Sequence, residues 1–392
     1  MPGQRPGSSR LVRLLFRVLV PALATALAAF LGYAYAVYPI WYHVAKVRKT
    51  ATLGGFLPSD KMLESMLGAY YEDNGLTVRA LDDVSWAVPT VMTPFVGFAP
   101  EPGEQHNAYI SPYQFRGRRT LEMPKPAGVI RIFLTGASVA FSAGAPSDER
   151  TIGGYVQKLL DKRHATTGWR YEVFTFATPS WSSTHERIAI ENRLSDLQPD
   201  LVLSLTGVAD ALYGERGQNV LWARALTDQY YWDLVNIALT RSGFGSMVDV
   251  QDVQKTPVPP DLVAERLRKN VMLASSALSL VGGRFQVFLQ PAIVTTGKTL
   301  GKREREWTRS GYFQNPAYYR ECYDRIDRLL RSSPLPSNVT FTNLSAIFDD
   351  LPEEQDVFLD SYHFGDRGND LIATAIVRAL RPTLSPLDGG QG

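Results

Sequence analysis

The sequence predicts an α/β fold: a doubly wound three-layer sandwich with a mainly parallel five-stranded sheet, preceded by one N-terminal transmembrane helix. Two observations predict it. From residue 126 onward, apolar runs of strand length alternate with segments of helical spacing. Near the N-terminus lies a long run without a charged residue. Strands that alternate with helices imply a parallel sheet, right-handed crossovers and helices on both faces.

Five strands and five helices account for the alternation. The third strand, DLVLSLTG, is nearly continuous in Leu and Val, as expected where both faces of a sheet are covered. The helices show apolar residues three and four positions apart. The expected strands are 128–136, 171–177, 200–207, 284–291 and 338–345. The expected helices are 151–163, 185–197, 262–281, 316–333 and 366–382.

The pattern divides the chain into four parts. Residues 1–17 are expected to form a basic cytoplasmic tail and 18–42 the transmembrane helix. Residues 43–125, rich in Gly and Pro, are expected to form a stem or lead-in subdomain. The regular α/β domain is expected at 126–385, with a helical insertion at about 211–260. The aromatic residues of that insertion would either stack on sugar rings or form the core of a small helical cap.

The N-terminal run contains no Asp, Glu, Lys or Arg between Arg17 and Lys46. A spanning helix needs roughly 20 apolar residues, so the run is long enough to cross a bilayer. Tyr and Trp residues cluster at its far end, as in an interfacial aromatic belt. The arginines before it favour a cytoplasmic N-terminus. The alternative is a signal cleaved after Ala36, and either reading places the remaining domain outside the cytoplasm.

Several function classes are excluded by composition and motif content. A net charge of +2 and the lack of an arginine-rich motif indicate no nucleic-acid partner. Cys322 is the only cysteine, which excludes an intrachain disulfide. The sequence contains no phosphate-binding or dinucleotide-binding glycine motif and no metal-ligand spacing. We therefore expect neither a cofactor nor a metal ion.

Ser138 directly follows the first expected strand, in LTGASVAFS. Sites in open α/β sheets form at the carboxyl ends of the strands. A serine at such an end is surrounded by backbone N–H groups and can act as a nucleophile if a base lies nearby. Taken alone, Ser138 also fits an ordinary turn or helix-cap serine.

Asp360 and His363 lie three residues apart just before the last helix, in FLDSYHFGDRGND. A short turn lets the carboxylate accept a hydrogen bond from one imidazole nitrogen while the other nitrogen faces outward as a base. A surface aspartate beside a capping histidine is the ordinary alternative. Because Ser138 follows the first strand and His363 follows the last one, the three residues predict a serine, histidine and aspartate triad.

Four blocks in this order carry a family resemblance. They are Gly136-Ala137-Ser138, the segment 179–183 (PSWSS), Gly207-Val208-Ala209-Asp210 and Asp360-Ser361-Tyr362-His363. From about Val129 to Leu380 the chain resembles the SGNH/GDSL hydrolase superfamily. SPYQFRGRR at 111–119 and LQP at 289–291 resemble its membrane-anchored bacterial branch. The resemblance implies an SGNH hydrolase-like domain at 126–385, in a single-pass protein of a bacterial inner membrane with a periplasmic or extracellular C-terminal domain.

The resemblance also assigns an oxyanion hole. Its donors would be the backbone N–H groups of Ser138 and Ser180, but the usual asparagine position is Ala209, which has no side-chain donor. Losing one such donor typically costs on the order of 10² to 10³ in rate. Another group could replace this donor, among residues 182–185 of the loop that follows the second expected strand (the second loop). His185 itself fits an ordinary polar residue at a helix start.

Three further residues are candidates for loop support: Gly136, Gly207 and Asp210. Asp210 could orient the nucleophile loop, or it could simply cap a helix. Arg116 and Arg367 are interpreted as ordinary surface arginines.

The sequence therefore predicts a membrane-anchored serine esterase or O-acyltransferase, acting on ester groups, with acetyl foremost, of a cell-surface polysaccharide or another carbohydrate. Its partners would be an acylated carbohydrate or small-molecule substrate, the membrane and polysaccharide-biosynthesis proteins. Ala209 motivates a second hypothesis, a non-catalytic glycan-binding or scaffolding subunit of a surface-polysaccharide assembly system. A cytoplasmic thioesterase conflicts with the N-terminal apolar run.

Overall fold

The computed structural model describes residues 8–53, 63–64, 66–75, 77, 81, 88–105, 107–217, 235–243, 245, 256–309 and 315–388. They belong to two units: residues 1–48 with 230–248, and residues 49–229 with 249–392. Most of residues 76–88 of the expected lead-in subdomain, and most of the aromatic part of the insertion, lie outside the described residues.

The first unit contains all but the last residues of the long helix α1, Ser8–Leu53. Its segment Leu15–Tyr38 is long and apolar enough to cross a membrane, and it also suits a signal sequence. Its apolar side chains are exposed, as expected for a helix that lipid would surround. In the same unit, the Arg241 guanidinium donates to the Ala36 carbonyl at 2.6 Å and lies over the Tyr35 ring.

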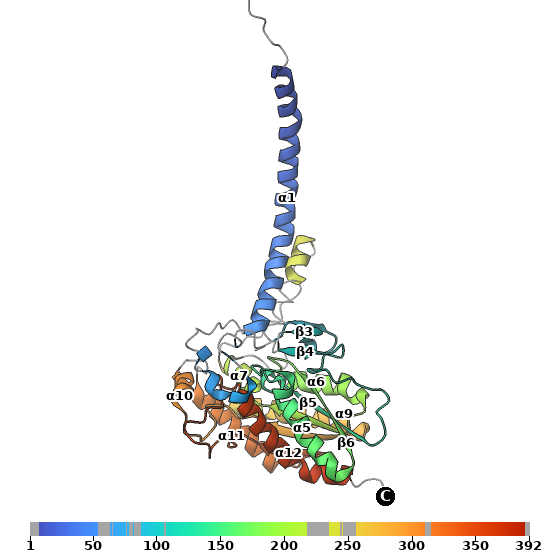
Figure 1. Ribbon diagram of the computed structural model, residues 1–392, viewed down its shortest axis with the longest axis vertical. Coiled ribbons are helices and arrows are strands. Elements are labelled where there is room, and N and C mark those ends of the chain that lie inside the picture. Colours follow the sequence, from blue (N-terminus) through green and yellow to red (C-terminus); the bar gives the residue numbers. More distant parts are fainter. Residues whose placement is uncertain are drawn as a thin grey trace, which may run out of the picture. The chain divides into compact units, whose positions relative to one another are not determined.

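The second unit contains a five-stranded parallel sheet, which confirms the predicted fold class (Figure 1). The strands, in their order across the sheet, are β6 (Arg170–Ala177), β5 (Val129–Gly136), β7 (Leu201–Thr206), β8 (Arg284–Leu289) and β9 (Val339–Asn343). Every residue of β5 and β7 is buried, as the continuous apolar runs predict. The chain reverses its direction of travel between β5 and β7, and ligands of such sheets bind at this switch point.

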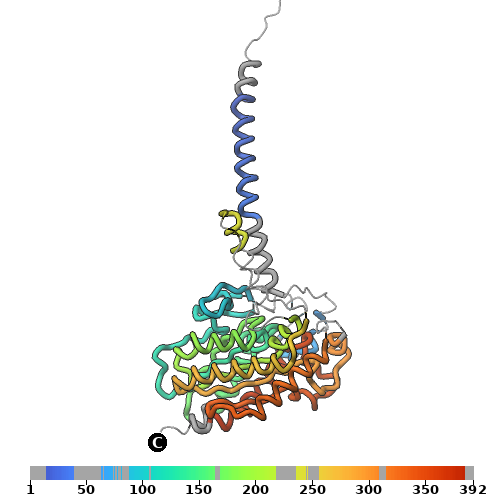
Figure 2. Tube along the Cα trace, turned by 180° about the vertical axis from the view of Figure 1, so that it is seen from behind, coloured from blue at the N-terminus to red at the C-terminus, as the bar shows by residue number. Residues whose placement is uncertain are grey.

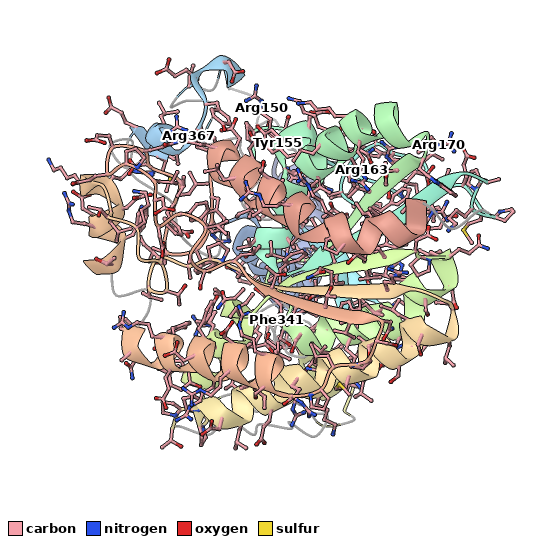
Figure 3. All side chains as sticks on the ribbon, turned by 90° about the horizontal axis from the view of Figure 1, so that it is seen from below. Arg150, Tyr155, Arg163, Arg170, Phe341 and Arg367 are labelled. Carbon is pink, nitrogen blue, oxygen red and sulfur yellow. The ribbon has the colours of Figure 1, made fainter. Side chains whose placement is uncertain are left out.

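Helices cover both faces of the sheet (Figure 3). One face carries α5 and α12, which pack on each other. The other carries α6, α9 and α11, side by side in the view from behind (Figure 2). The bounds are α5 Ile152–Thr167, α6 Ser183–Ala189, α9 Pro260–Leu280, α11 Pro316–Ser332 and α12 Asp366–Asp388. Cys322 is buried on α11, and burial raises the pKa of its thiol to about 12.

Shorter elements lie at the ends of the sheet. α6 continues into a π-helical turn, Ile190–Leu194, and a 3-10 turn, Ser195–Leu197. The helix α10, Lys302–Arg309, was not expected from the sequence. The short helices α4 (Ser138–Phe141) and α7 (Val208–Glu215) follow β5 and β7. Three further 3-10 turns are η1 (Leu67–Ala69), η2 (Glu72–Asn74) and η3 (Asp148–Arg150).

Two antiparallel hairpins precede the sheet. They are β1–β2 (Thr90–Thr93 and Gly97–Pro100) and β3–β4 (Gly103–Gln105 and Ala108–Ile110). The chain then reaches the edge strand β6 through a bridge between Arg116 and Thr175. The neighbouring Phe115 packs against Phe133, Phe174 and Phe176, so this end of the lead-in segment contributes to the core.

Candidate active site

Ser138 is the first residue of α4, directly beyond the carboxyl end of β5. The turn requires Gly136, which has a φ of 151°. A Cβ on Gly136 would lie 2.4 Å from the Leu205 carbonyl oxygen and 2.6 Å from Cβ of Ala140. The close approach of β5 to β7 therefore fixes glycine at this position and sets where Ser138 emerges.

His363 and Asp360 meet Ser138 at the switch point. The Ser138 Oγ lies 2.8 Å from His363 Nε2, and His363 Nδ1 lies 2.6 Å from Asp360 Oδ2. The other carboxylate oxygen of Asp360 accepts the backbone N–H groups of Tyr362 and His363. Asp360 accepts the proton on Nδ1, which leaves Nε2 free to accept the Ser138 hydroxyl proton. The three residues predicted as a triad are thus brought into one hydrogen-bonded chain.

The charge on Asp360 is favoured by its surroundings. Burial acts to raise the pKa of this carboxyl. The His363 imidazole and the hydrogen bonds from His363 and Tyr362 outweigh that effect, so the pKa lies below its ordinary value. Asp360 is therefore ionised at neutral pH and can stabilise a positive charge on His363.

A buried ion pair supports the loop that carries Asp360. Lys298 Nζ lies 2.8 Å from Glu304 Oε2, and both side chains are fully buried. The other Glu304 oxygen accepts the backbone N–H groups of Val357 and Phe358. Arg303 adds a hydrogen bond to the Phe358 carbonyl. Nothing in the sequence indicated this network, because charged residues in such a segment usually face solvent.

Arg116 supports the nucleophile side, and its interpretation as a surface arginine was wrong. The residue is 7% exposed. Its guanidinium pairs with Asp148 at 2.9 Å and donates to the carbonyls of Phe141 and Ser142, at the end of α4. Burial lowers the pKa of Arg116, and Asp148 acts to raise it. The planar guanidinium can reach three acceptors at once, which explains why an arginine is placed here.

Arg367 is only partly buried. It donates to the carbonyls of Gly68 and Tyr70 and lies over the Tyr71 ring. It therefore connects α12 to the lead-in segment rather than standing free on the surface. Figure 3 shows it near Arg150 and Tyr155.

Ser180 lies in the loop after β6 with a φ of 73°, the left-handed region that favours glycine. The Tyr213 hydroxyl donates to its carbonyl oxygen at 2.6 Å, and the next residue, Trp181, donates its N–H to Thr178. Among the described residues, no acceptor lies in hydrogen-bond range of the backbone N–H groups of Ser138 and Ser180. Both N–H groups therefore remain available to a bound substrate.

Ala209 contributes no donor. It lies in α7, where it forms a buried cluster with Ala137 and Tyr213. The side chains of the second loop are occupied in other contacts. The hydroxyl of Ser182 contacts His185 Nδ1, Ser183 donates to Asp210, and Thr184 accepts from Asn270.

His185 begins a helix, as expected, but it is buried rather than an ordinary exposed polar residue. It packs in parallel with the ring of Trp181. Burial lowers the pKa of His185 to about 4, so the imidazole is neutral at pH 7.

Asp210 supports the second loop rather than the nucleophile loop. Its carboxylate accepts the hydroxyl and the N–H of Ser183 at 2.6 and 3.0 Å. The alternative reading as a helix cap was wrong, because Gly207 occupies that position in α7. Burial raises the pKa of Asp210, and its hydrogen bonds from Ser183 oppose the rise. Gly207 has a φ of 120°, and a Cβ there would lie 2.4 Å from Leu289 Cδ1.

No group of three or more His, Cys, Asp or Glu side chains is placed to hold a metal ion within the part of the chain that the structure describes.

Comparisons with known proteins give only distant likenesses. No family model and no curated protein matches the chain. Among solved structures, an acetyl xylan esterase is 15% identical with a TM-score of 0.40, over 64% of this chain and 100% of its own. TesA is 13% identical with a TM-score of 0.37, over 64% and 98%. An acetyl-xylooligosaccharide esterase from Geobacillus is 12% identical with a TM-score of 0.40, over 64% and 94%.

The parallel five-stranded sheet and the hydrogen-bonded chain from Ser138 through His363 to Asp360 are those that the resemblance to the SGNH hydrolases implies. Likenesses this distant assign no activity to this chain.

Proposed function

We propose that this chain is a membrane-anchored serine esterase or O-acyltransferase that acts on ester groups, with acetyl foremost, of a cell-surface polysaccharide or another carbohydrate. One observation carries the proposal: Ser138, His363 and Asp360 form a hydrogen-bonded chain at 2.8 and 2.6 Å. This is the arrangement that acyl transfer through a serine needs.

The residues suggest the following steps. His363 Nε2 takes the hydroxyl proton as Ser138 Oγ attacks the ester carbonyl carbon. The oxyanion receives hydrogen bonds from the N–H groups of Ser138 and Ser180. The bond to the leaving alcohol breaks, and His363 returns the proton to that oxygen. A second hydroxyl then loses its proton to His363 and attacks the acyl carbonyl carbon. The bond from that carbon to Ser138 Oγ breaks, and His363 returns the proton to Oγ. Water in this step gives an esterase, and a sugar hydroxyl gives an O-acyltransferase.

The location belongs to the same proposal. We place the α/β domain outside the cytoplasm of a bacterium, on a single span of the inner membrane. The apolar segment Leu15–Tyr38 supports an anchor, and the preceding arginines support a cytoplasmic N-terminus. A reporter enzyme that is active only after export, fused behind residue 388, is expected to be active. An inactive reporter on a stable fusion would contradict this orientation.

The activity is tested with the full chain in detergent, beside the variant Ser138→Ala. We expect an aryl acetate to be hydrolysed and a fluorophosphonate to label the wild type, and both signals to be lost in the variant. Acetylated xylan or mannan, supplied with and without an unacetylated acceptor glycan, then separates release of acetate from transfer to the acceptor.

Ala209 favours a second candidate, a non-catalytic glycan-binding or scaffolding subunit that works with polysaccharide-biosynthesis proteins. This candidate predicts equal background signals from the wild type and Ser138→Ala, together with glycan binding that does not depend on Ser138.

A further inference from the structure

Tyr213 and Ser180 are in contact across two of the segments assigned to the oxyanion hole. Tyr213 lies near Ala209, which lacks a side-chain donor, and Ser180 keeps its backbone N–H donor. Tyr213 lies in α7, four residues after Ala209, and residues at this spacing share one face of a helix. Its side chain is almost fully buried. Its hydroxyl donates to the Ser180 carbonyl at 2.6 Å. A side chain of α7 therefore acts on the backbone of the loop after β6.

Ser180 needs such support because of its backbone conformation. At a φ of 73°, a residue with a Cβ is disfavoured relative to glycine. A rotation to negative φ would relieve that strain and change the direction of the Ser180 N–H. The hydrogen bonds from Tyr213 to the Ser180 carbonyl and from Trp181 to Thr178 oppose the rotation.

The small side chain at position 209 lies in the same buried cluster as the tyrosine ring. Ala209, Ala137 and Tyr213 form this cluster, and Ala137 directly precedes Ser138 in the chain. An asparagine at position 209 would offer an N–H₂ group of its own. Here the same face of α7 instead contributes the Tyr213 hydroxyl, which holds the backbone of Ser180.

We propose that Tyr213 is a positioning residue of this site: its hydroxyl holds the Ser180 peptide so that the Ser180 N–H points at the oxyanion of the tetrahedral intermediate. The inference rests on the proposed function. Tyr213 acts through Ser180, because its single hydroxyl proton is already donated to the Ser180 carbonyl. The Tyr213 hydroxyl therefore stabilises the transition state, in which the oxyanion carries its charge, more than the bound substrate.

The test compares Tyr213→Phe with the wild type, as full chains in detergent with an aryl acetate. Removing one positioning hydrogen bond is expected to lower kcat about fivefold to tenfold and to change KM less than about twofold. Tyr318→Phe is the matched control, because it removes a 2.7 Å hydroxyl bond to the Val258 carbonyl. We expect its kcat to stay within about twofold of the wild type.

The double variant Tyr213→Phe, Ser180→Gly separates positioning from packing. Glycine adopts positive φ freely, so this variant is expected to regain a large part of the lost kcat. A structural defect would not be repaired by a glycine in another loop. Rates are expressed per site labelled by a fluorophosphonate, so a partly unfolded preparation does not lower them.

The outcomes separate this inference from the proposed function. Loss of turnover in Tyr213→Phe and recovery in the double variant support it. A kcat of Tyr213→Phe equal to that of the wild type, with turnover that depends on Ser138, overturns the positioning role alone. A double variant as slow as Tyr213→Phe also overturns it. A wild type without Ser138-dependent turnover overturns both proposals.

Discussion

The two sides of the site are held by different kinds of contacts. The side with Asp360 and His363 rests on buried charges. Glu304, which is paired with Lys298, and Arg303 bind the backbone just before Asp360. On the other side, the Ser180 carbonyl itself is held by one neutral group, the Tyr213 hydroxyl. Proton transfer by His363 and oxyanion binding by Ser180 therefore depend on different contacts. We expect one set of substitutions to impair proton transfer and another to impair oxyanion binding.

The largest effect is expected from Asp360→Asn, on the charged side. The amide cannot accept and hold the His363 proton as the carboxylate does, so kcat should fall about 10³-fold to 10⁴-fold. Steady-state hydrolysis of an aryl acetate measures it. Asp350→Asn, at an exposed position of the preceding loop, is the control and should leave kcat unchanged. A loss of less than about tenfold in Asp360→Asn would show that the carboxylate does not orient the base.

Next in size is Arg116→Met, which tests whether charge also supports the nucleophile side. Removing the guanidinium leaves Asp148 and the carbonyls of Phe141 and Ser142 without their buried partner. The free energy of unfolding should fall by about 3 kcal/mol, as measured by denaturant titration. Arg118→Met breaks an exposed pair with Glu104 and should change nothing measurable. Equal free energies of unfolding for Arg116→Met and Arg118→Met would contradict the stabilising role assigned to Arg116.

A gain of function is expected from Ala209→Asn, on the side with Ser180. If the amide reaches the oxyanion, kcat should rise about 10-fold to 10²-fold. Ala209→Leu adds a side chain of similar size without a donor, so it should give no rise. The aryl acetate assay used for Asp360→Asn measures both. A rise in both variants would mean that size, rather than the donor, limits the rate.

The smallest effect concerns Glu186, a buried carboxyl that accepts from the Ser204 hydroxyl behind the second loop. Burial raises its pKa to about 7. The folded chain therefore holds a proton that the unfolded chain releases, and the resulting stability is present below about pH 4.5 and is lost as the pH rises through 7. Between about pH 5.5 and 7.5 the loss should be roughly 1–2 kcal/mol.

Thermal unfolding at several pH values tests this. Glu186→Gln should lack this part of the pH dependence. The nearby His185, with a pKa of about 4, contributes stability above pH 6.5 that is lost as the pH falls through 4, so it acts in the opposite direction. An unchanged slope in Glu186→Gln would assign the pH dependence to other groups.

The sheet was predictable because its signal is local. The apolar runs of β5 and β7 and the spacing in α5 and α9 follow directly from burial on one or both faces. Ser138 and His363 are 225 residues apart, so only the order of the four blocks paired them. The supports could not be predicted, because the partners of Arg116, Glu304 and Tyr213 lie on other segments. A buried arginine and an exposed one look alike in a single sequence.

The buried thiol of Cys322 allows the two sides of the site to be compared by spectroscopy with thiol-reactive labels. It is buried, and at a pKa of about 12 it stays protonated in neutral buffer, so alkylating reagents will spare it. A cysteine introduced at an exposed position therefore becomes the single reactive thiol without removal of the native one. Spin or fluorescent labels placed in turn on the two sides of the site can then report which of them moves when a covalent inhibitor binds.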